Sequence, residues 1–246
     1  MLSALRAIFK KELSFPFAGI GVDMHAHVLP GLDDGADTME KALAMVAELI
    51  RLGYRKLILT PHIMGDFYKN TPHNIHQQLA LLQQAVQLRG WPIALACAAE
   101  YYLDEWFLDK VQASEPLLSF GGQYVLIETS YINEALNFKE AVFALQSAGY
   151  IPVLAHPERY TYLYGRFEEL RKIRETGVLL QLNLNSLTGY YSQRARRVAE
   201  KLVDEKLVDF VGTDAHHTRH LQALTKTAAT PYFKKVLDLP LQNYHL

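Results

Sequence analysis

The sequence predicts an α/β protein whose parallel strands close into a barrel of about seven strand–helix units. Short apolar runs alternate with segments of helical periodicity along the chain, and this alternation is typical of a parallel sheet. A length of 246 residues suits a single α/β barrel. No linker, low-complexity tract or internal repeat divides the chain. A doubly wound open sheet is the alternative fold.

The first strand–helix unit sets the pattern for the others. An apolar strand is expected at residues 19–24, and a helix is expected over 37–53, opening near Thr38 and ending at Gly53. The apolar residues of this helix share one face: Met39, Leu43, Val46 and Ile50. The strand is short and apolar, as expected for a strand that helices cover on both faces.

The other units follow in order along the chain. Strands are expected at residues 54–60, 92–98, 123–128, 151–155, 178–184 and 207–213. Helices are expected at residues 74–90, 104–114, 133–149, 165–177 and 192–206, with further helical material after the last strand. Three of these helices end at a glycine: Gly90, Gly149 and Gly177. We treat residues 1–19 as an N-terminal arm and 20–246 as one domain.

The composition excludes several classes of protein. With 25 basic and 26 acidic residues the formal net charge is −1, so no nucleic-acid partner is expected. The single cysteine, Cys97, excludes a disulfide framework. No apolar run approaches about 20 residues, so no transmembrane segment is expected, and the N-terminal arm does not form a convincing signal peptide. We therefore expect a cytoplasmic protein.

Side chains suited to metal binding follow six of the seven predicted strands. In chain order they are His25 and His27, His62, Glu100, Glu128, His156, and Asp214 with His216. Because the carboxyl ends of barrel strands meet at one rim, these groups are expected to converge. Any one of them alone could be a cap or a solvated side chain. Together their carboxylates would repel one another, whereas bound cations would stabilise the set.

The spacing inside two motifs supports a metal centre. His25 and His27 lie two residues apart, so their side chains point the same way from an extended strand end, and Asp214 and His216 repeat this spacing. Imidazoles and carboxylates without thiolate suit Mn, Fe or Zn. Eight ligands exceed the capacity of one ion, so we expect two or three divalent metals with a bridging glutamate. Paired metals about 3.5–4 Å apart are typical of phosphoesterase sites. The residues that follow the remaining strand, Asn183 and Asn185, are poor ligands.

Arg159 follows the fifth predicted strand. It could form a salt bridge within its loop, for example with Glu158, but beside a metal centre a guanidinium suits phosphate, which it binds through two parallel hydrogen bonds. A cysteine-dependent phosphatase would need Cys-x5-Arg, whereas Leu103 stands at that distance from Cys97. Cys97 is therefore expected to be a core residue.

The chain resembles the PHP (polymerase and histidinol phosphatase) superfamily in a series of motifs: DMHAHVLPGLDDGADTMEKAL, TPHIM, AAEYYLDE, LIETS, LAHPERY and GTDAHH. More narrowly it is similar to bacterial manganese-dependent protein-tyrosine phosphatases of capsule and exopolysaccharide loci. The resemblance covers roughly residues 20–235. The His-x-His pair is weakly specific, whereas H-x-H-x-L-P-G-x-D-D-G combined with H-P-E-R-Y is specific to the phosphatase branch. The resemblance implies a distorted seven-stranded (βα) TIM-like barrel, the PHP fold, as one phosphatase domain.

The resemblance also implies roles for individual residues. A first metal would have four ligands: His25, His27, Glu100 and Asp214. A second metal would share Glu100 as a bridge and add two ligands: Glu128 and His156. A third would be held with the help of two imidazoles: His62 and His216. Arg159 would bind the phosphate, and Asp34 would lie near the site as an acid/base catalyst, a supporting residue or only a loop residue.

The implied activity is hydrolysis of phosphotyrosine on a partner protein, a bacterial tyrosine kinase that regulates polysaccharide synthesis or export, with Mn as the metal. Three alternatives stay open: a small-molecule phosphatase such as a histidinol-phosphate phosphatase, a metal-dependent nuclease, and a metal-binding scaffold that docks a kinase. Aromatic residues in the predicted rim loops 65–72 and 160–165 suit an aryl phosphate or a peptide, but could equally pack at the top of the barrel. Residues 192–201 could form an interface or a solvated helix face.

Overall fold

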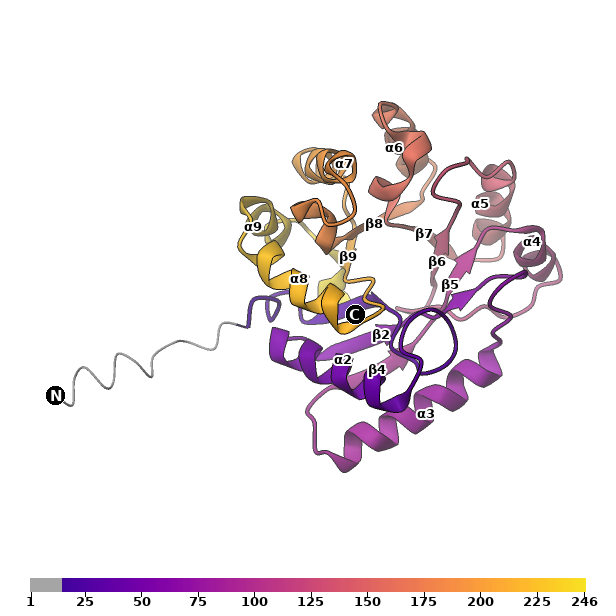
Figure 1. Cartoon of the computed structure of the whole chain (residues 1–246). Coiled ribbons are helices and arrows are strands. Elements are labelled where there is room, and N and C mark those ends of the chain that lie inside the picture. Colours follow the sequence, from indigo (N-terminus) through magenta and orange to yellow (C-terminus); the bar gives the residue numbers. More distant parts are fainter. Residues whose placement is uncertain (1–14) are drawn as a thin grey trace.

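Parallel strands form the centre of the molecule, and helices surround them (Figure 1). The computed structural model describes residues 15–246. One sheet has the strand order β1-β2-β4, the other has the order β3-β5-β6-β7-β8-β9, and the strands within each sheet pair in parallel. The strand bounds are β1 Val22–Ala26, β2 Lys56–Leu59, β3 His62–Ile63, β4 Ala94–Cys97, β5 Glu100–Tyr102, β6 Tyr124–Glu128, β7 Ile151–Ala155, β8 Leu179–Asn183 and β9 Phe210–Gly212.

The helices lie close to the predicted positions, except that α5 begins at Phe138 rather than at residue 133. Their bounds are α2 Met39–Leu52, α3 Pro72–Leu88, α4 Glu105–Gln112, α5 Phe138–Ser147, α6 Phe167–Glu175, α7 Gln193–Asp204, α8 Thr218–Ala228 and α9 Pro231–Leu237. Short 3-10 segments are η1 Pro157–Arg159, η2 Thr161–Leu163, η3 Leu184–Thr188 and η4 Gln242–His245. Helix α2 begins and ends where its capping residues predict. The Thr38 hydroxyl accepts from the Lys41 amide, and Gly53 ends the helix at a φ of 105°.

The part of the chain that the structure describes contains nine strands, where the sequence predicted seven. The two additional strands, β3 and β5, are short continuations of β2 and β4. Pro61 lies between β2 and β3 and has no N–H to donate, so the ladder is interrupted there. The neighbouring strand is interrupted at the same level, between Cys97 and Glu100. The prediction of a parallel α/β fold is confirmed, whereas the count of strands is corrected.

The two sheets are connected on one side by a backbone hydrogen bond and on the other by the chain itself. On one side, the amide of Asp214, just after β9, donates to the carbonyl of His25 in β1 at 2.8 Å. On the other side, β3 follows β2 and β5 follows β4 after breaks of two residues, so the chain itself passes from one sheet into the other. The carboxyl ends of strands from both sheets are therefore held next to one another.

The C-terminal segment ties β1 to β9. The buried amide side chain of Asn243, in η4, donates to the carbonyls of Val22 and Val211 at 3.1 and 2.8 Å. Its oxygen accepts from the Val211 amide at 2.9 Å. These hydrogen bonds fix the amino-terminal halves of two strands whose carboxyl ends carry predicted site residues.

Part of the predicted N-terminal arm belongs to the packed domain. Phe17 is fully buried, and its ring lies 5.5 Å from the ring of Tyr54 and 4.9 Å from that of Phe233. The predicted boundary at residue 20 therefore lies after the start of the core, and residues 1–14 of the arm lie outside the described residues. Among the described helices, none combines the length and the apolar character needed to cross a membrane.

Candidate metal centre

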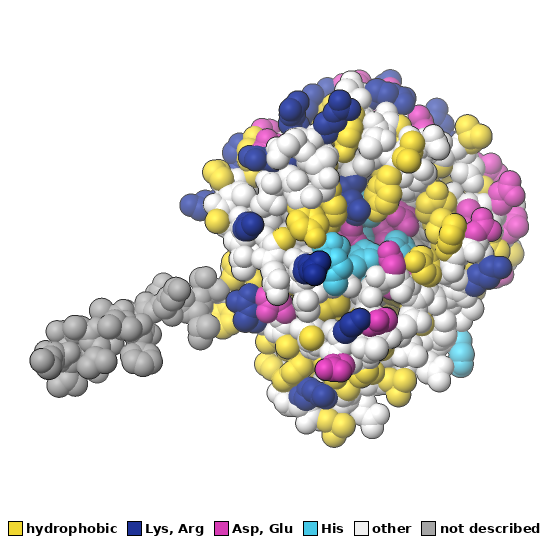
Figure 2. Space-filling view, in the orientation of Figure 1, with side chains coloured by type: hydrophobic (Ala, Val, Ile, Leu, Met, Phe, Trp, Pro, Cys, Tyr) yellow, Lys and Arg dark blue, Asp and Glu magenta, His cyan; other side chains and the backbone are white. Residues whose placement is uncertain are grey.

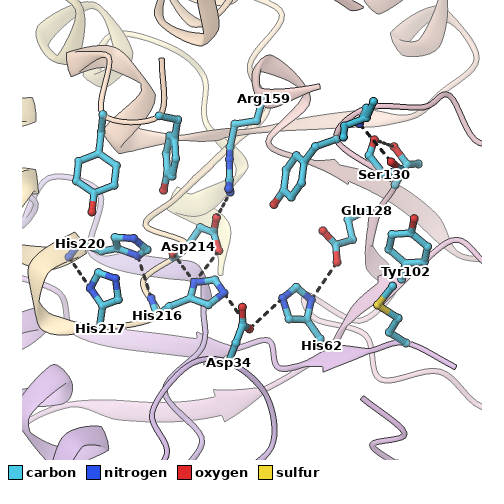
Figure 3. A pocket seen from close by; sticks show the side chains of 16 residues that line it. Asp34, His62, Tyr102, Glu128, Ser130, Arg159, Asp214, His216, His217 and His220 are labelled. Carbon is cyan, nitrogen blue, oxygen red and sulfur yellow. Dashed lines mark hydrogen bonds and ion pairs between the residues drawn. The ribbon is translucent and has the colours of Figure 1, made fainter. Parts of the chain in front are cut away.

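The predicted ligands converge at the carboxyl ends of the strands, although they come from positions spread over almost the whole chain. Figure 2 shows histidine and acidic side chains meeting in a hollow on one face of the molecule, bordered by hydrophobic side chains. Figure 3 shows Asp34, His62, Glu128, Arg159, Asp214 and His216 directed toward this hollow. His25, His27 and Glu100 lie beneath them and are fully buried.

The most deeply buried group comprises His25, His27, Glu100 and Asp214, whose ligand atoms lie within 4.8 Å of one another. The two Nε2 atoms are 3.2 Å apart, and each lies 3.2 Å from Oε2 of Glu100. Oδ1 of Asp214 lies 3.5 Å from His25 and 3.4 Å from His27. Four ligand atoms thus face one point, and they belong to the residues that the family resemblance implied for a first metal.

A second group forms around the two glutamates. Nδ1 of His62 lies 3.2 Å from Oε2 of Glu100 and 3.0 Å from Oε1 of Glu128. Nε2 of His156 lies 3.0 Å from the other Glu100 oxygen, Oε1, and 4.0 Å from Oε2 of Glu128. The two oxygens of Glu100 therefore face different imidazoles, an arrangement that suits a bridging carboxylate. His62 joins this group, whereas the resemblance placed it only with the third metal.

A third group gathers His27, His62 and His216 around Asp34. Oδ1 of Asp34 lies 3.5 Å from Nε2 of His62 and 3.4 Å from Nε2 of His216. Partial burial opposes ionisation, but the hydrogen bond and charge of His216 hold the pKa of Asp34 at about 2. The sequence left three roles open for Asp34. The geometry adds a fourth, that of a metal ligand, because its ionised carboxylate faces two imidazole nitrogens.

The contacts inside the cluster fit cations better than hydrogen bonds. Oε2 of Glu100 and Nδ1 of His62 are buried and make no hydrogen bond within residues 15–246, although they lie 3.2 Å apart. Burial opposes charge on His62, yet Glu100 and Glu128 raise its pKa to about 9 against this effect and the charge of His27. The carboxylates therefore attract positive charge, which bound divalent ions would supply.

Two of the candidate ligands have an unusual backbone conformation. His156 has a φ of 33° and Asp214 a φ of 48°, in the left-handed region that non-glycine residues rarely adopt. His156 directly follows β7 and Asp214 lies two residues after β9, so both turns occur at strand ends. Strain of this kind is typically stored at functional sites.

Neighbouring side chains orient the imidazoles, and the sequence analysis did not single them out. Asp33 accepts from Nδ1 of His27 at 2.7 Å, and Gln181 lies 2.9 Å from Nδ1 of His25. Each interaction leaves Nε2 of the histidine free to face the cluster, as is usual for metal-ligating histidines. The adjacent acids in LDDG signalled Asp33, but nothing local distinguished it from Asp34 or pointed to Gln181 in β8.

Asn183, judged a poor ligand, has a supporting role instead. Its side-chain amide donates to Oδ2 of Asp214 at 2.9 Å and to the hydroxyl of Tyr191 at 3.0 Å. Asn185 donates to the carbonyl of His220, away from the cluster. One of the two asparagines therefore orients a candidate ligand.

Arg159 pairs with Asp214 rather than with Glu158. Its Nη1 donates to Oδ2 of Asp214, so the loop salt bridge considered from the sequence does not form. Glu158 points into the core, where it accepts from the Ser186 hydroxyl and the Asn183 amide. Burial, partly offset by the hydrogen bond from Ser186, raises the pKa of Glu158 to about 7. Arg159 is thereby free to face the cavity beside a candidate ligand.

A cavity of about 670 Å³ lies above the cluster, and its tyrosines come from other segments than those predicted. Four tyrosines line it: Tyr102, Tyr131, Tyr190 and Tyr191. In the predicted rim loops, Tyr160 is fully buried and Phe67 is 74% exposed, and neither lines the cavity. The loop 160–165 instead packs against the domain, because Tyr160 and Leu163 are buried.

Cys97 does not take part in this site. It lies at the end of β4, half-buried rather than in the core as predicted, and its sulfur is 3.5 Å from Nδ1 of His76 on α3. Burial raises the pKa of the thiol to about 11. A thiol of that pKa outside the cavity cannot serve as the phosphatase nucleophile.

Fold and site together define a class of protein. It is a parallel α/β protein whose strand ends carry a cluster of imidazoles and carboxylates able to bind metal, beside an arginine in an aromatic-lined cavity. A sequence model of one family, described as capsular polysaccharide synthesis, CpsB/CapC, matches residues 21–238. The chain belongs to this family.

Curated relatives of the chain are tyrosine phosphatases by name. Tyrosine-protein phosphatase YwqE of Bacillus subtilis is 30% identical over 199 residues, which are 80% of this chain and 78% of the relative. The putative tyrosine-protein phosphatase CapC of Staphylococcus aureus is 25% identical over 79% of this chain and 76% of its own length.

Two solved structures resemble this one. One belongs to a study of YwqE from Bacillus subtilis and CpsB from Streptococcus pneumoniae, described as unique metal-dependent tyrosine phosphatases. It superimposes with a TM-score of 0.76 at 28% identity, covering 90% of this chain and 94% of its own. Histidinol phosphate phosphatase from Lactococcus lactis has a TM-score of 0.53 at 15% identity over 85% of this chain and 92% of its own, a likeness of fold alone.

Proposed function

We propose that this chain is a metal-dependent protein-tyrosine phosphatase that does not use a cysteine. The observation that carries the proposal is the buried set of imidazole and carboxylate atoms below a cavity that contains Arg159 and four tyrosines. The metal-dependent tyrosine phosphatases named among the relatives and the solved structures support the same activity.

We assign eight predicted residues and Asp34 as ligands for two or three divalent ions, with Mn favoured over Fe or Zn. The first ion would be held by His25, His27, Glu100 and Asp214. The second would be held by Glu100, Glu128 and His156, with His62 close by. The third would be held by His62, His216 and Asp34. Ions bound there would activate water and neutralise negative charge on the phosphate.

The chain's own residues bind and orient the substrate. Arg159 donates hydrogen bonds to phosphate oxygens, and the tyrosines surround the aryl group. The phenol released from phosphotyrosine has a pKa of about 10, so the leaving group needs less protonation than an alkoxide would. This suits a site in which the pKa of Asp34 is about 2, because an ionised carboxylate supplies no proton.

The aromatic lining favours an aryl phosphate over the alternative, a small-molecule phosphatase acting on a substrate such as histidinol phosphate. Tyr131 and Tyr190 are 37% and 43% exposed at the cavity, so their rings are accessible to a ligand. An aryl ring gains contact area from such neighbours, whereas a small alkyl phosphate gains less. A net charge of −1 gives a nuclease no electrostatic support.

Three further assignments belong to the same proposal. The substrate is a phosphotyrosine protein, which we take to be a bacterial tyrosine kinase that controls polysaccharide synthesis or export. The protein acts in the cytoplasm. The two sheets are parts of one distorted barrel with seven strand positions, in which β2 with β3 and β4 with β5 each count as one interrupted strand.

The test compares p-nitrophenyl phosphate, a phosphotyrosyl peptide and histidinol phosphate as substrates, with Mn and with a chelator. His156→Ala is expected to lower kcat/KM at least about 100-fold, because it removes a ligand. His73→Ala, on the exposed start of α3, is the matched control and should retain activity. Activity that survives both the chelator and His156→Ala would refute the metal mechanism, and preference for histidinol phosphate would refute the tyrosine phosphatase assignment.

A further inference from the structure

We propose that Tyr131 and Tyr191 are positioning residues that hold the Arg159 guanidinium in place for phosphate binding. The inference deepens the proposed function and rests on it, because it takes Arg159 as the residue that binds the phosphate. Tyr131 and Tyr191 determine how Arg159 is presented to the phosphate.

Two separate rings contact the same cation. The central carbon of the guanidinium, Cζ, lies 4.6 Å from the ring centre of Tyr131 and 4.1 Å from that of Tyr191. Both distances are within the range of cation–π attraction. Tyr131 comes from the loop after β6, Tyr191 precedes α7, and Arg159 ends η1, so three distant segments of the chain meet at this point.

The contacts leave part of the guanidinium available to a ligand. Of its five N–H donors, only Nη1 makes a hydrogen bond to a residue within 15–246, and that bond goes to Asp214. The side chain is 18% exposed and lines the cavity, and Figure 3 shows it pointing into the cavity toward Asp214. Nη2 and Nε therefore remain as donors for phosphate oxygens.

Aromatic rings suit this task better than a second carboxylate would. A carboxylate would occupy the N–H donors that the phosphate needs, whereas a ring attracts the face of the cation and leaves its edge free. Holding the long arginine side chain before the ligand arrives also reduces the conformational entropy lost on binding. The rings therefore restrict Arg159 without competing with the phosphate.

Tyr131 offers the cleaner of the two substitutions. Its hydroxyl makes no hydrogen bond within the described residues, and its backbone carbonyl accepts from Thr161, so Tyr131→Phe keeps the ring and removes little else. Tyr131→Leu removes the ring. The Tyr191 hydroxyl accepts from Asn183, which also donates to Asp214, so Tyr191→Leu serves as the second variant should Tyr131→Leu fail to fold.

The experiment measures binding of inorganic phosphate to the Mn-loaded full chain by isothermal titration calorimetry, with manganese content determined for every variant. We expect Tyr131→Leu to weaken phosphate binding about 10-fold and Tyr131→Phe to bind within about twofold of the wild type. In an Arg159→Ala background, Tyr131→Leu should have no further effect, because the residue acts only through Arg159. Tyr232→Leu is the matched control. Tyr232 lies on α9, outside the cavity lining, and the centre of its ring is 4.3 Å from Nζ of Lys235. Loss of this ring should leave phosphate binding unchanged.

Three results would contradict the inference. An equal loss from Tyr131→Leu with and without Arg159 would mean that the ring acts independently of the guanidinium. A loss from Tyr131→Phe as large as that from Tyr131→Leu would assign the effect to the hydroxyl, and unchanged binding in Tyr131→Leu would exclude a role. Calorimetry measures phosphate binding and does not depend on catalysis. A chain that binds phosphate in this way and yet does not hydrolyse phosphotyrosine would refute the proposed function and leave the inference intact.

Discussion

Replacing Asp33 by alanine is expected to weaken both the fold and metal binding, although Asp33 is not itself among the assigned ligands. Its buried carboxylate accepts three hydrogen bonds: from Nδ1 of His27 at 2.7 Å, from the His62 amide at 3.0 Å and from the Gly35 amide at 3.0 Å. The substitution leaves these donors without a partner inside the protein.

The expected magnitude follows from that count. A net contribution of about 1 kcal/mol for each hydrogen bond gives a loss of about 3 kcal/mol, which lowers the melting temperature by roughly 6–12 °C in a chain of this size. Loss of the partner that orients a metal-ligating histidine typically costs about 10–100-fold in metal affinity. Asp33→Asn keeps one acceptor oxygen and should lose less stability than Asp33→Ala, while still weakening metal binding because the charge is gone.

Two measurements on the full chain test this prediction for Asp33: thermal unfolding followed by circular dichroism, and Mn binding measured by calorimetry. Asp37→Ala is the matched control, because Asp37 lies in the same segment but is exposed and pairs only with Lys41. It should melt and bind Mn as the wild type does. Wild-type Mn affinity in Asp33→Ala, or an equal loss in Asp37→Ala, would refute the reasoning.

Three further outcomes are expected. Removing metal with EDTA should lower the melting temperature by roughly 5–10 °C, and added Mn should restore it, because ligand at about 100 times its Kd stabilises by about 2.7 kcal/mol; a melting curve indifferent to both would count against a metal centre. Phe17→Ala should destabilise the chain by about 3–5 kcal/mol in urea unfolding, whereas Phe15→Ala, at a ring that is 49% exposed, should not, and equal effects would show that residue 17 is not a core position. Cys97→Ser should keep phosphatase activity, since the thiol lies outside the cavity, and its loss would reopen a cysteine mechanism.

The convergence of the candidate ligands could be predicted because the position of each one depends on a local rule. A polar residue at the end of an apolar strand lies at the rim where parallel strands end, and the rule needs no knowledge of which strands are neighbours. His25 and His27 illustrate this: their spacing directs both side chains the same way, and in the structure their Nε2 atoms are 3.2 Å apart. The division of the candidate ligands into groups was harder to predict from the sequence, since His62 lies between both glutamates and Asp34.

Supporting residues could not be found in this way. Gln181 reaches His25 across 156 positions of sequence, and Arg159 reaches Asp214 across 55. Such pairs depend on which strands pack together and on side-chain rotamers, neither of which leaves a periodic signal in the sequence. The tyrosines of the cavity belong to the same category, because Tyr160 in the predicted rim loop is buried while Tyr131 and Tyr191 face Arg159.

By itself the sequence determined the parallel α/β class, the alternation of strands and helices, and the polar residues near the strand ends, because hydrophobic periodicity and capping act over a few neighbouring positions. Only the tertiary structure decided that Pro61 interrupts the ladder, that Phe17 joins the core, and that Arg159 pairs with Asp214 between two tyrosines. These features depend on contacts between segments far apart in the chain, and the energy of such contacts is set by packing geometry rather than by residue type.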